Sequence, residues 1–276
     1  MRALTAAGGR GRAIAQPRAG DAVFDACLRL MTILAPTLTQ PMALDETLRE
    51  RGHAVLDVAG LASLIGEAGL RELQGLARLW EDLPLDGHLR DGGSYRRRRH
   101  GCFVVTGERV EAVPHRAHWQ PAVYNALHGG IERWFEPLDA RMSEAAAWER
   151  LLVALGRRAS ALRGARPWFV EAHPFRIDTE GGIGRPTPEG AHRDGVDLVA
   201  VLLVARHGVK GGETRVFEAR GARGLRFTLS EPWTLLLLDD ARVIHETTPI
   251  QPLAPDVRGW RDTLVLTYRT GGFQSP

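Results

Sequence analysis

The hydrophobic and polar positions of this chain follow one spacing before Gly164 and another after it. Before Gly164, apolar residues recur every three or four positions, which is typical of amphipathic helices. This spacing predicts helices on both sides of a short strand at His53–Leu56 and over residues 70–80, 120–135 and 141–162. A second short strand is expected at residues 102–107.

After Gly164 the chain becomes a series of short apolar and β-branched runs. The runs are separated by Gly, Pro and Asp, the residues typical of turns. They read RPWFVEAHPFRID, DLVAVLLVAR, ETRVFEA, LRFTLS, PWTLLLLDD, RVIHETTPI and DTLVLTYRT. Short strands at this spacing, with no helix between them, indicate a β-sandwich or jelly roll. We therefore expect an α+β fold, with a β core over 164–276 and a helical flank over 45–163.

Residues 1–44 differ from the rest of the chain. They are rich in Ala, Gly, Arg and Thr and poor in acidic residues, and they carry the whole net charge of +3. We expect a disordered or loosely helical extension. A transit-like peptide, or a translated stretch upstream of a true start at Met42, would look the same. Residues 45–276 are expected to form one domain.

Composition excludes several classes of protein. No run of about 18 apolar residues is present, so no membrane-spanning helix is expected. Cys27 and Cys102 are too few for a disulfide framework or a thiolate zinc site. Beyond residue 44 the charges balance, which argues against a nucleic-acid surface. We expect a cytoplasmic protein that acts on a small molecule; the sequence carries no signal of an oligomeric state.

The strongest chemical signal is the segment GAHRDG, in which His192 and Asp194 are two positions apart. On a strand, such positions point to the same face. His245 follows 53 residues later, a separation that returns the chain to the same end of a jelly roll. Two His and one carboxylate, with the other metal positions open, form the facial triad of non-haem iron(II) oxygenases. The sequence thus predicts an iron site at these three residues.

A cation for an anionic cosubstrate follows on the last predicted strand. Two imidazoles and one carboxylate leave Fe(II) positively charged, which favours a dianionic chelating cosubstrate. Arg261 is expected to bind the far end of that molecule, because guanidinium holds a carboxylate bidentately and stays charged. Thr263 shares its face and can add a hydroxyl hydrogen bond. Arg269, at the far end of the same strand, is the rival residue.

Other interpretations of these residues stay open at this point. A His-x-Asp pair occurs by chance in many proteins, His192 can cap a turn, and His245 can be a core histidine. A zinc hydrolase can also use His₂Asp, although it needs a general base and has no use for Arg261. A cupin-like metal- or ligand-binding regulatory protein that has lost turnover is the alternative from another functional class, and it need not keep Arg261.

From about Tyr95 to its end, the chain contains the segments YRRRRHGCF, YNALHGGIERWFEPL, WFVEAHPFRI, EGAHRDGVDLVAVLLVAR, GGETRVFE, LLLLDDARVIHETTPI and RDTLVLTY. Through these segments it resembles the iron(II)/2-oxoglutarate dioxygenases, and among them the bacterial L-isoleucine hydroxylase and related free amino-acid hydroxylases.

This resemblance implies a double-stranded β-helix, a cupin-like jelly roll, with Fe(II) held by His192, Asp194 and His245. It implies that 2-oxoglutarate chelates the iron while Arg261 binds its distal carboxylate. The expected reaction uses O2, decarboxylates 2-oxoglutarate to succinate and hydroxylates a C–H bond of a small substrate.

Some residues have both a structural and a functional interpretation. The run SYRRRRHG is expected to be a solvated face, but Tyr95, Arg97 and Arg99 are also candidates for holding a substrate carboxylate. Thr214, in a predicted hairpin, is a further candidate for substrate contact.

Two further pairs of residues complete these expectations. Trp134 and Phe135 are expected in the core on a helix. Asp239 and Asp240 are expected to make a turn, or to orient His245.

Overall fold

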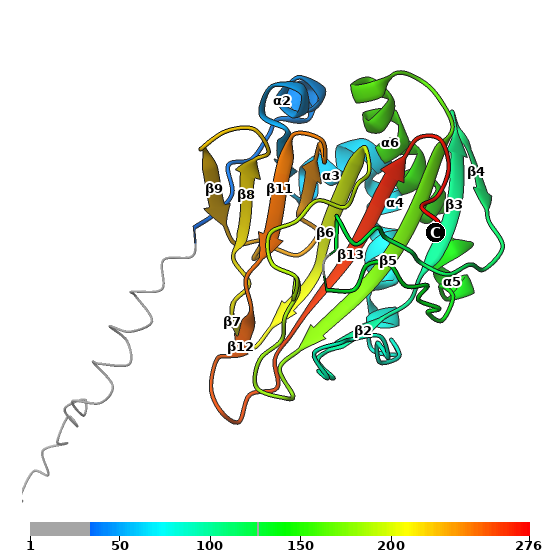
Figure 1. Ribbon diagram of the computed structural model, residues 1–276. Helices are drawn as coiled ribbons and strands as arrows, with labels where there is room; N and C mark the ends of the chain where they lie inside the picture. The colour runs from blue at the N-terminus through cyan, green and yellow to red at the C-terminus, as the bar shows by residue number, and fades with distance from the viewer. Residues whose placement is uncertain (1–33, 126) are drawn as a thin grey trace, which may run out of the picture. The chain divides into compact units, whose positions relative to one another are not determined.

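The helices of the computed structural model, which describes residues 34–125 and 127–276, all begin before residue 164 (Figure 1). They are η1 (Pro41–Ala43), α2 (Leu44–Arg51), α3 (Val58–Ile65), α4 (Glu67–Gly75), η2 (Ala77–Trp80), α5 (Ala140–Ser143) and α6 (Ala146–Arg163). The strands are β1 (His53–Leu56), β2 (Arg96–Arg98), β3 (Gly101–Thr106), β4 (Arg109–Ala112), β5 (Trp168–Asp178), β6 (Leu198–His207), β7 (Val209–Gly211), β8 (Thr214–Glu218), β9 (Gly224–Phe227), β10 (Leu235–Leu238), β11 (Val243–Thr247), β12 (Ile250–Pro252) and β13 (Trp260–Arg269). The expected mixture of an N-terminal helical part and a β-rich C-terminal part is confirmed.

Eight strands form one antiparallel sheet with β13 near its middle. Its order is β1-β10-β6-β13-β5-β3-β4, and β2 also pairs with β5. Because side chains alternate along a strand, β13 contributes residues to both faces of the sheet. Leu264, Leu266 and Tyr268 lie in the main hydrophobic core, whereas Arg261, Thr263, Val265 and Thr267 line a cavity on the opposite face.

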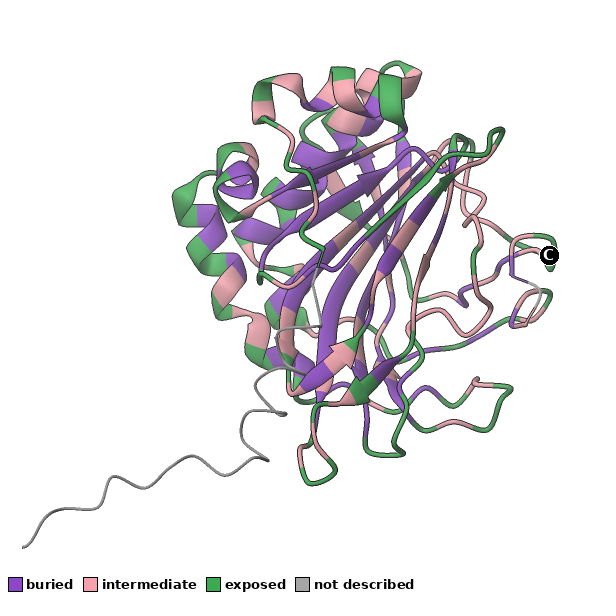
Figure 2. Cartoon of the chain, turned by 90° about the vertical axis from the view of Figure 1, so that its left-hand side faces the viewer, coloured by how far each residue is buried: buried purple, intermediate pink, exposed green. Residues whose placement is uncertain are grey.

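The helices cover the core face of this sheet. The amphipathic helix α6 buries Trp148, Leu151 and Leu155 in the same cluster as Tyr268 of β13. The Tyr268 hydroxyl, which is also buried, donates to the carbonyl oxygen of Leu152 at 3.0 Å. Figure 2 shows buried residues along the sheet and on the helix faces that meet it. This layer makes the central strands a rigid support for the side chains on their other face.

A smaller sheet of order β11-β8-β9 lies beside the other face, and β7 pairs with β12. Val216 and Val243 of the smaller sheet share a second core cluster with Val199, Leu203 and Leu236 of the large sheet. The two sheets are thus joined through apolar side chains, and β11 is held above the cavity face of the large sheet.

One predicted helix is wrong. No described residue in 120–135 is helical; the segment runs as turns and an isolated bridge between His118 and Arg133. Gly130 adopts φ 74°, and a Cβ at Gly129 would lie 2.4 Å from the Asn125 carbonyl oxygen. These glycines turn the chain tightly where a helix would have continued. As a result Trp134 is 56% exposed, against the expectation of a core residue, whereas Phe135 is buried as expected.

The predicted extension, residues 1–44, is described only from Leu34 onward; residues 1–33 lie outside the described part of the chain. Residues 34–44 contact the domain. The Leu34 carbonyl accepts from Thr228 N–H at 2.8 Å, Thr39 N–H donates to the Val55 carbonyl at 2.7 Å, and Leu44 is fully buried. Within the described residues, no helix combines the length and apolar character needed to cross a membrane.

Candidate metal centre and cosubstrate pocket

A cavity of about 130 Å³ lies on the face of the large sheet opposite the helices. Strands β2, β5 and β13 supply one wall, and β11 and the loop before β6 supply another. Residues between 113 and 139 and Gln274 near the C-terminus complete the lining. The metal-ligand and cosubstrate candidates from distant parts of the sequence therefore meet in one cavity.

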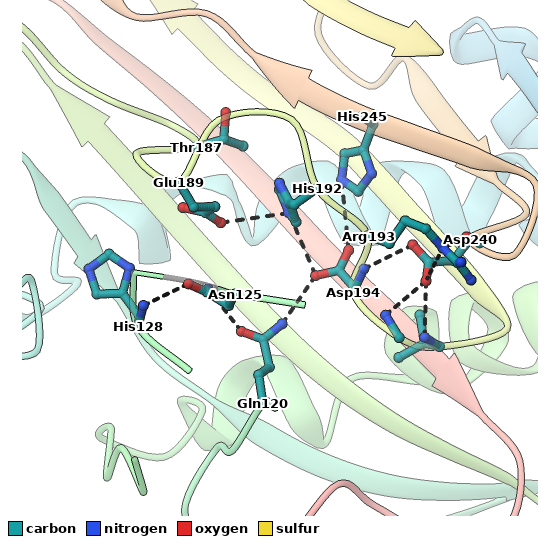
Figure 3. Close-up of polar contacts among 12 residues, drawn as sticks. Gln120, Asn125, His128, Thr187, Glu189, His192, Arg193, Asp194, Asp240 and His245 are labelled. Atoms are coloured by element: carbon teal, nitrogen blue, oxygen red, sulfur yellow. Dashed lines mark hydrogen bonds and ion pairs between the residues drawn. The ribbon is translucent and has the colours of Figure 1, made fainter. Parts of the chain in front are cut away.

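His192, Asp194 and His245 come together in this cavity (Figure 3). The Nε2 atom of His192 lies 3.9 Å from Oδ1 of Asp194, and the Nε2 atom of His245 lies 3.7 Å from Oδ2. The ligand atoms of all three lie within 4.8 Å of one another. His192 and Asp194 lie in the loop before β6 and not on a strand. A backbone bridge between His192 and His245 still holds both on one side, with N–H to O distances of 3.0 and 2.9 Å.

The imidazoles are arranged as metal ligands require. Nδ1 of His192 donates to the Gly190 carbonyl at 2.9 Å, which leaves the lone pair of Nε2 free toward Asp194. Burial, reinforced by the neighbouring His192, lowers the pKa of His245 to about 3. His245 is therefore neutral near pH 7, which is the form that binds a metal. The donor set fits Fe(II) with open coordination positions.

The loop that carries Asp194 is held from behind by Asp240. The Asp240 carboxylate accepts the N–H groups of Asp194, Gly195 and Val196 at 3.0, 2.8 and 3.1 Å. The turn expected at Asp239 and Asp240 is confirmed, since the Asp239 carbonyl accepts from Arg242 N–H at 2.9 Å. The alternative expectation was that a carboxylate here orients His245, but the Asp240 carboxylate holds the Asp194 backbone instead.

Two glutamines that the sequence did not single out also hold the Asp194 loop. Gln120 donates to Oδ1 of Asp194 at 3.3 Å, and Gln274 donates to the carbonyls of Asp194 and Gly195. Neither glutamine belongs to a recognisable motif, because each reaches the loop only through the fold.

Arg261 lies on the same cavity wall as Thr263. Its side chain is buried, and its Nε and Nη2 atoms have no hydrogen-bond partner among the described residues. Burial and the nearby Arg206 lower the pKa of Arg261 to about 10, so the guanidinium stays charged at neutral pH. A buried cation without a partner carboxylate is destabilising unless a ligand supplies the anion. The rival Arg269 lies outside the cavity lining and donates to the Gly272 carbonyl.

The comparisons with known proteins agree with this geometry. The sequence profile of the 2OG-Fe dioxygenases matches residues 77–267. The chain belongs to the 2OG-Fe dioxygenase family. This dioxygenase therefore uses Fe(II), 2-oxoglutarate and O2, and His192, Asp194 and His245 form a group able to hold the iron.

Solved structures extend the comparison. A BsmA homologue from Methylobium petroleophilum is 56% identical, with a TM-score of 0.82 over 89% of this chain and 99% of that one. The Fe(II)/α-ketoglutarate-dependent dioxygenase TqaL is 20% identical, with a TM-score of 0.60 over 85% and 90%. IDO from Bacillus thuringiensis is 14% identical, with a TM-score of 0.68 over 88% and 99%. The last two show similarity of fold alone. No curated protein matched the chain.

The structure places the residues proposed for the substrate outside the cavity lining of the dioxygenase. Arg97 lies 3.6 Å from Asp178, and Arg99 donates to the Pro137 carbonyl. The Tyr95 hydroxyl donates to Asp91, and Thr214 is buried where β8 pairs with β9 and β11. None of the four lines the cavity.

Their neighbours Arg96 and Arg98 do line the cavity. Directly paired residues of an antiparallel sheet lie on the same face. Arg96 and Arg98 pair with Ile177 and Phe175 of β5, which are themselves cavity residues. The register of β2 therefore corrects the expectation that Arg97 and Arg99 face the substrate.

A second buried polar cluster, which the sequence did not indicate, forms part of the cavity wall of the dioxygenase, because His118, Glu171 and His173 line the cavity. It contains His100, His118, Glu171 and His173. Glu171 accepts from Nδ1 of His118 at 2.9 Å and lies 3.5 Å from Nε2 of His100. Burial lowers the pKa of His118 to about 4. Imidazoles that are neutral near pH 7 thus surround one buried carboxylate.

The chemistry of this cluster is that of a hydrogen-bond network. The Arg98 guanidinium can only donate, so Nδ1 of His173, at 2.6 Å, accepts. Nε2 of His173 then carries the hydrogen and faces Glu171 at 3.9 Å, without a lone pair for a metal. The cluster therefore holds Arg98 in place at the cavity wall.

Proposed function

We propose that this dioxygenase hydroxylates a small free L-amino acid or a close derivative, coupled to oxidative decarboxylation of 2-oxoglutarate. The observation that carries the proposal is the meeting of His192, Asp194 and His245 with the unpartnered Arg261 in one cavity. The resemblance of the cavity-forming segments to free amino-acid hydroxylases supports the substrate class. A cavity of about 130 Å³ suits small molecules, since a cavity of about 150 Å³ holds benzene.

The protein residues have separate roles in this proposal. His192, Asp194 and His245 hold the iron, which supplies activation of O2 and of the substrate C–H bond when bound. Arg261 and Thr263 bind the distal carboxylate of 2-oxoglutarate, which orients the cosubstrate. The neighbouring Val265 and other apolar lining residues exclude water. One O2 is consumed, one oxygen atom goes to succinate and the other to the hydroxylated substrate, and CO2 leaves.

The finer structural assignment is also part of the proposal. The smaller sheet, joined through apolar residues to the large antiparallel sheet, supports a double-stranded β-helix as the core architecture. A cytoplasmic location stays a prediction.

Succinate release tests the reaction. The purified protein, reconstituted with Fe(II), is incubated with 2-oxoglutarate and each free L-amino acid, with His192→Ala as the control. We expect one or a few amino acids to stimulate release in the wild type and none in the variant. Release that no amino acid stimulates would move the substrate to another chemical class. No release with iron demonstrably bound would contradict the proposed turnover by this protein.

A further inference from the structure

Arg98 presents a buried guanidinium group to the cavity, and burial lowers its pKa well below the usual value. It is 3% exposed, and its guanidinium carbon lies 3.8 Å from the ring centre of Phe135 and 4.4 Å from that of Phe175. Its Nη2 atom donates to His173, and its Nε atom has no partner. Among the described residues, no carboxylate lies within 4.0 Å of it. The two rings hold the charge in place, but nothing neutralises it directly.

Arg133 presents a second such charge to the same cavity. It is 2% exposed, its Nη2 atom donates to Oε1 of Gln120 at 2.9 Å, and its Nε atom has no partner. Burial and Arg96 lower the pKa of Arg133 to about 10, so it is charged at neutral pH. Arg96 differs from both, because it is paired with Asp86 at 2.7 Å. In the described part of the chain, Arg133 has no carboxylate within ion-pair distance.

The position of Arg133 ties this positive region to the metal centre. Gln120 accepts from Arg133 and donates to Oδ1 of Asp194 at 3.3 Å. One amide side chain thus separates the guanidinium from a metal-binding carboxylate. Arg261, on strand β13, is already assigned to 2-oxoglutarate. Arg98 and Arg133 are thus two further cationic side chains in the cavity that holds the metal-binding group.

Glu189 provides a negative charge in the same cavity. It lies on the loop that carries His192, and Figure 3 shows the two side by side. Its Oε1 atom is 3.6 Å from Nε2 of His192, and its Oε2 atom is buried without a hydrogen-bond partner. Because Nδ1 of His192 carries the hydrogen, Nε2 presents a lone pair and does not donate to Glu189. Glu189 also lies outside the group of three metal-binding residues. Its carboxylate is left available to a ligand cation.

From these charges we infer that the cavity binds a zwitterion, with the substrate carboxylate at Arg98 and Arg133 and the substrate ammonium at Glu189. The inference rests on the proposed function and names the residues that would recognise the amino acid. Opposite charges at separate places in one cavity fit a molecule that carries both. A neutral ligand would leave all three groups buried and unpaired, which is unfavourable.

Paired changes in ligand and protein test this assignment. The probes are the most stimulating L-amino acid, its carboxamide and its N-acetyl derivative, compared by the concentration that half-saturates succinate release. The wild type should favour the amino acid over either derivative by about 30-fold or more, the factor for a buried charged hydrogen bond. Arg98→Gln or Arg133→Gln should reduce the preference over the carboxamide only. Glu189→Gln should reduce the preference over the N-acetyl derivative only.

Two controls accompany these variants. Arg97→Gln removes a neighbouring charge that points away from the cavity, and it should leave both preferences at their wild-type values. Glu189→Gln should bind iron at the wild-type stoichiometry; loss of iron would assign Glu189 to the metal and overturn its role at the ammonium. If every variant keeps the wild-type preference for the amino acid over both derivatives, the zwitterion site is overturned. It is also overturned if every variant, Arg97→Gln included, loses both preferences to the same extent. The proposed reaction stands in either case.

A binding measurement separates this inference from the proposed function. If no amino acid stimulates succinate release, the proposed substrate class fails. The same probe panel, built on each L-amino acid in turn, is then read by thermal shift of the wild type with Fe(II) and 2-oxoglutarate. An amino acid that raises the Tm when its carboxamide and N-acetyl derivative do not would support the zwitterion site. No rise with any amino acid would overturn it.

Discussion

At the scale of single residues, three arginines that line the cavity of this dioxygenase, Arg98, Arg133 and Arg261, have no carboxylate partner among the described residues. Buried arginines normally pair with carboxylates, because desolvation of an isolated charge costs several kcal/mol. Asp262, next to Arg261, pairs with Arg176 instead, at 2.7 Å. The free guanidinium of Arg261 is therefore a property of the binding site and not of the sheet around it.

Arg261→Ala should raise the concentration of 2-oxoglutarate needed for half-maximal turnover by about 30-fold or more, since a buried charged hydrogen bond contributes about 2–5 kcal/mol. Steady-state kinetics at a saturating amino acid would measure it. Arg269→Ala is the matched control, because it removes an arginine of the same strand that lies outside the cavity. The assignment is wrong if Arg269→Ala shows the larger effect.

Asp194→Ala should abolish stoichiometric iron binding, because it removes the only carboxylate of the three-residue group and leaves two neutral imidazoles. The iron content of the variant after anaerobic reconstitution and desalting measures this stoichiometry. A circular dichroism spectrum and a Tm close to those of the wild type would show that the variant still folds. Full iron stoichiometry in the folded variant contradicts the proposed metal site.

At the scale of elements, β13 and the loop before β6 show how the backbone aims these side chains. β13 alternates between the helix-covered core and the cavity, so the spacing of Arg261 and Thr263 places both on one wall. The loop has no such regularity. It depends on Asp240, whose pKa is raised by burial and by the nearby Asp194, and which accepts the three backbone N–H groups of residues 194–196.

Asp240→Ala should weaken iron binding by about 10- to 100-fold, as is usual for a residue that orients a metal ligand. The loop loses its acceptor, so Asp194 no longer holds one position relative to His192 and His245. Iron titration under anaerobic conditions measures the change. Asp239→Ala is the control: it removes the neighbouring carboxylate, which pairs with Arg163, and should lower stability without this loss of affinity. Equal iron affinities in the two variants would show that Asp240 does not position the loop.

At the scale of the whole molecule, burial of neutral imidazoles makes stability depend on pH. The pKa of His118 falls from 6.5 to about 4 on burial, and burial also lowers the pKa of His100 and His173. Unfolding exposes these groups and restores their ordinary pKa. Between about pH 4 and 6.5 these histidines therefore bind more protons in the unfolded chain than in the folded one, and their contribution to stability increases with pH in this window.

The contribution of this histidine cluster to the free energy of unfolding should accordingly fall as the pH is lowered from about 6.5 to about 4. The shift at His118 alone corresponds to a loss of ~3 kcal/mol. Guanidinium chloride unfolding of the metal-free protein at a series of pH values measures it. In His118→Gln the free energy of unfolding should change less with pH than in the wild type. The same dependence of stability on pH in the wild type and in His118→Gln would contradict the buried neutral cluster.

Local patterns determined much of this protein. The helical spacing of residues 141–162, which the structure divides into α5 and α6, and the alternation in the final strand depend on residues close together in the sequence. The order His192, Asp194, His245, Arg261 is a recognisable family pattern. The structure brings the metal-binding group and Arg261 into one cavity, as those patterns indicated. The alternation of apolar and polar residues along a strand involves only neighbouring positions, so it can be recognised in the sequence without knowing the fold.

Only the tertiary structure decided which polar residues share the cavity. The pairing of β2 with β5 selected Arg96 and Arg98 over Arg97 and Arg99, because register is set by contacts between strands distant in sequence. Glycine turns converted an apparent helix at 120–135 into the irregular chain that carries Arg133, Gln120 and Asn125 to the cavity. The Glu171 cluster and the support of Asp240 arise in the same way. A hydrogen bond between residues far apart in sequence leaves no periodic signal, and it exists only once the chain has folded.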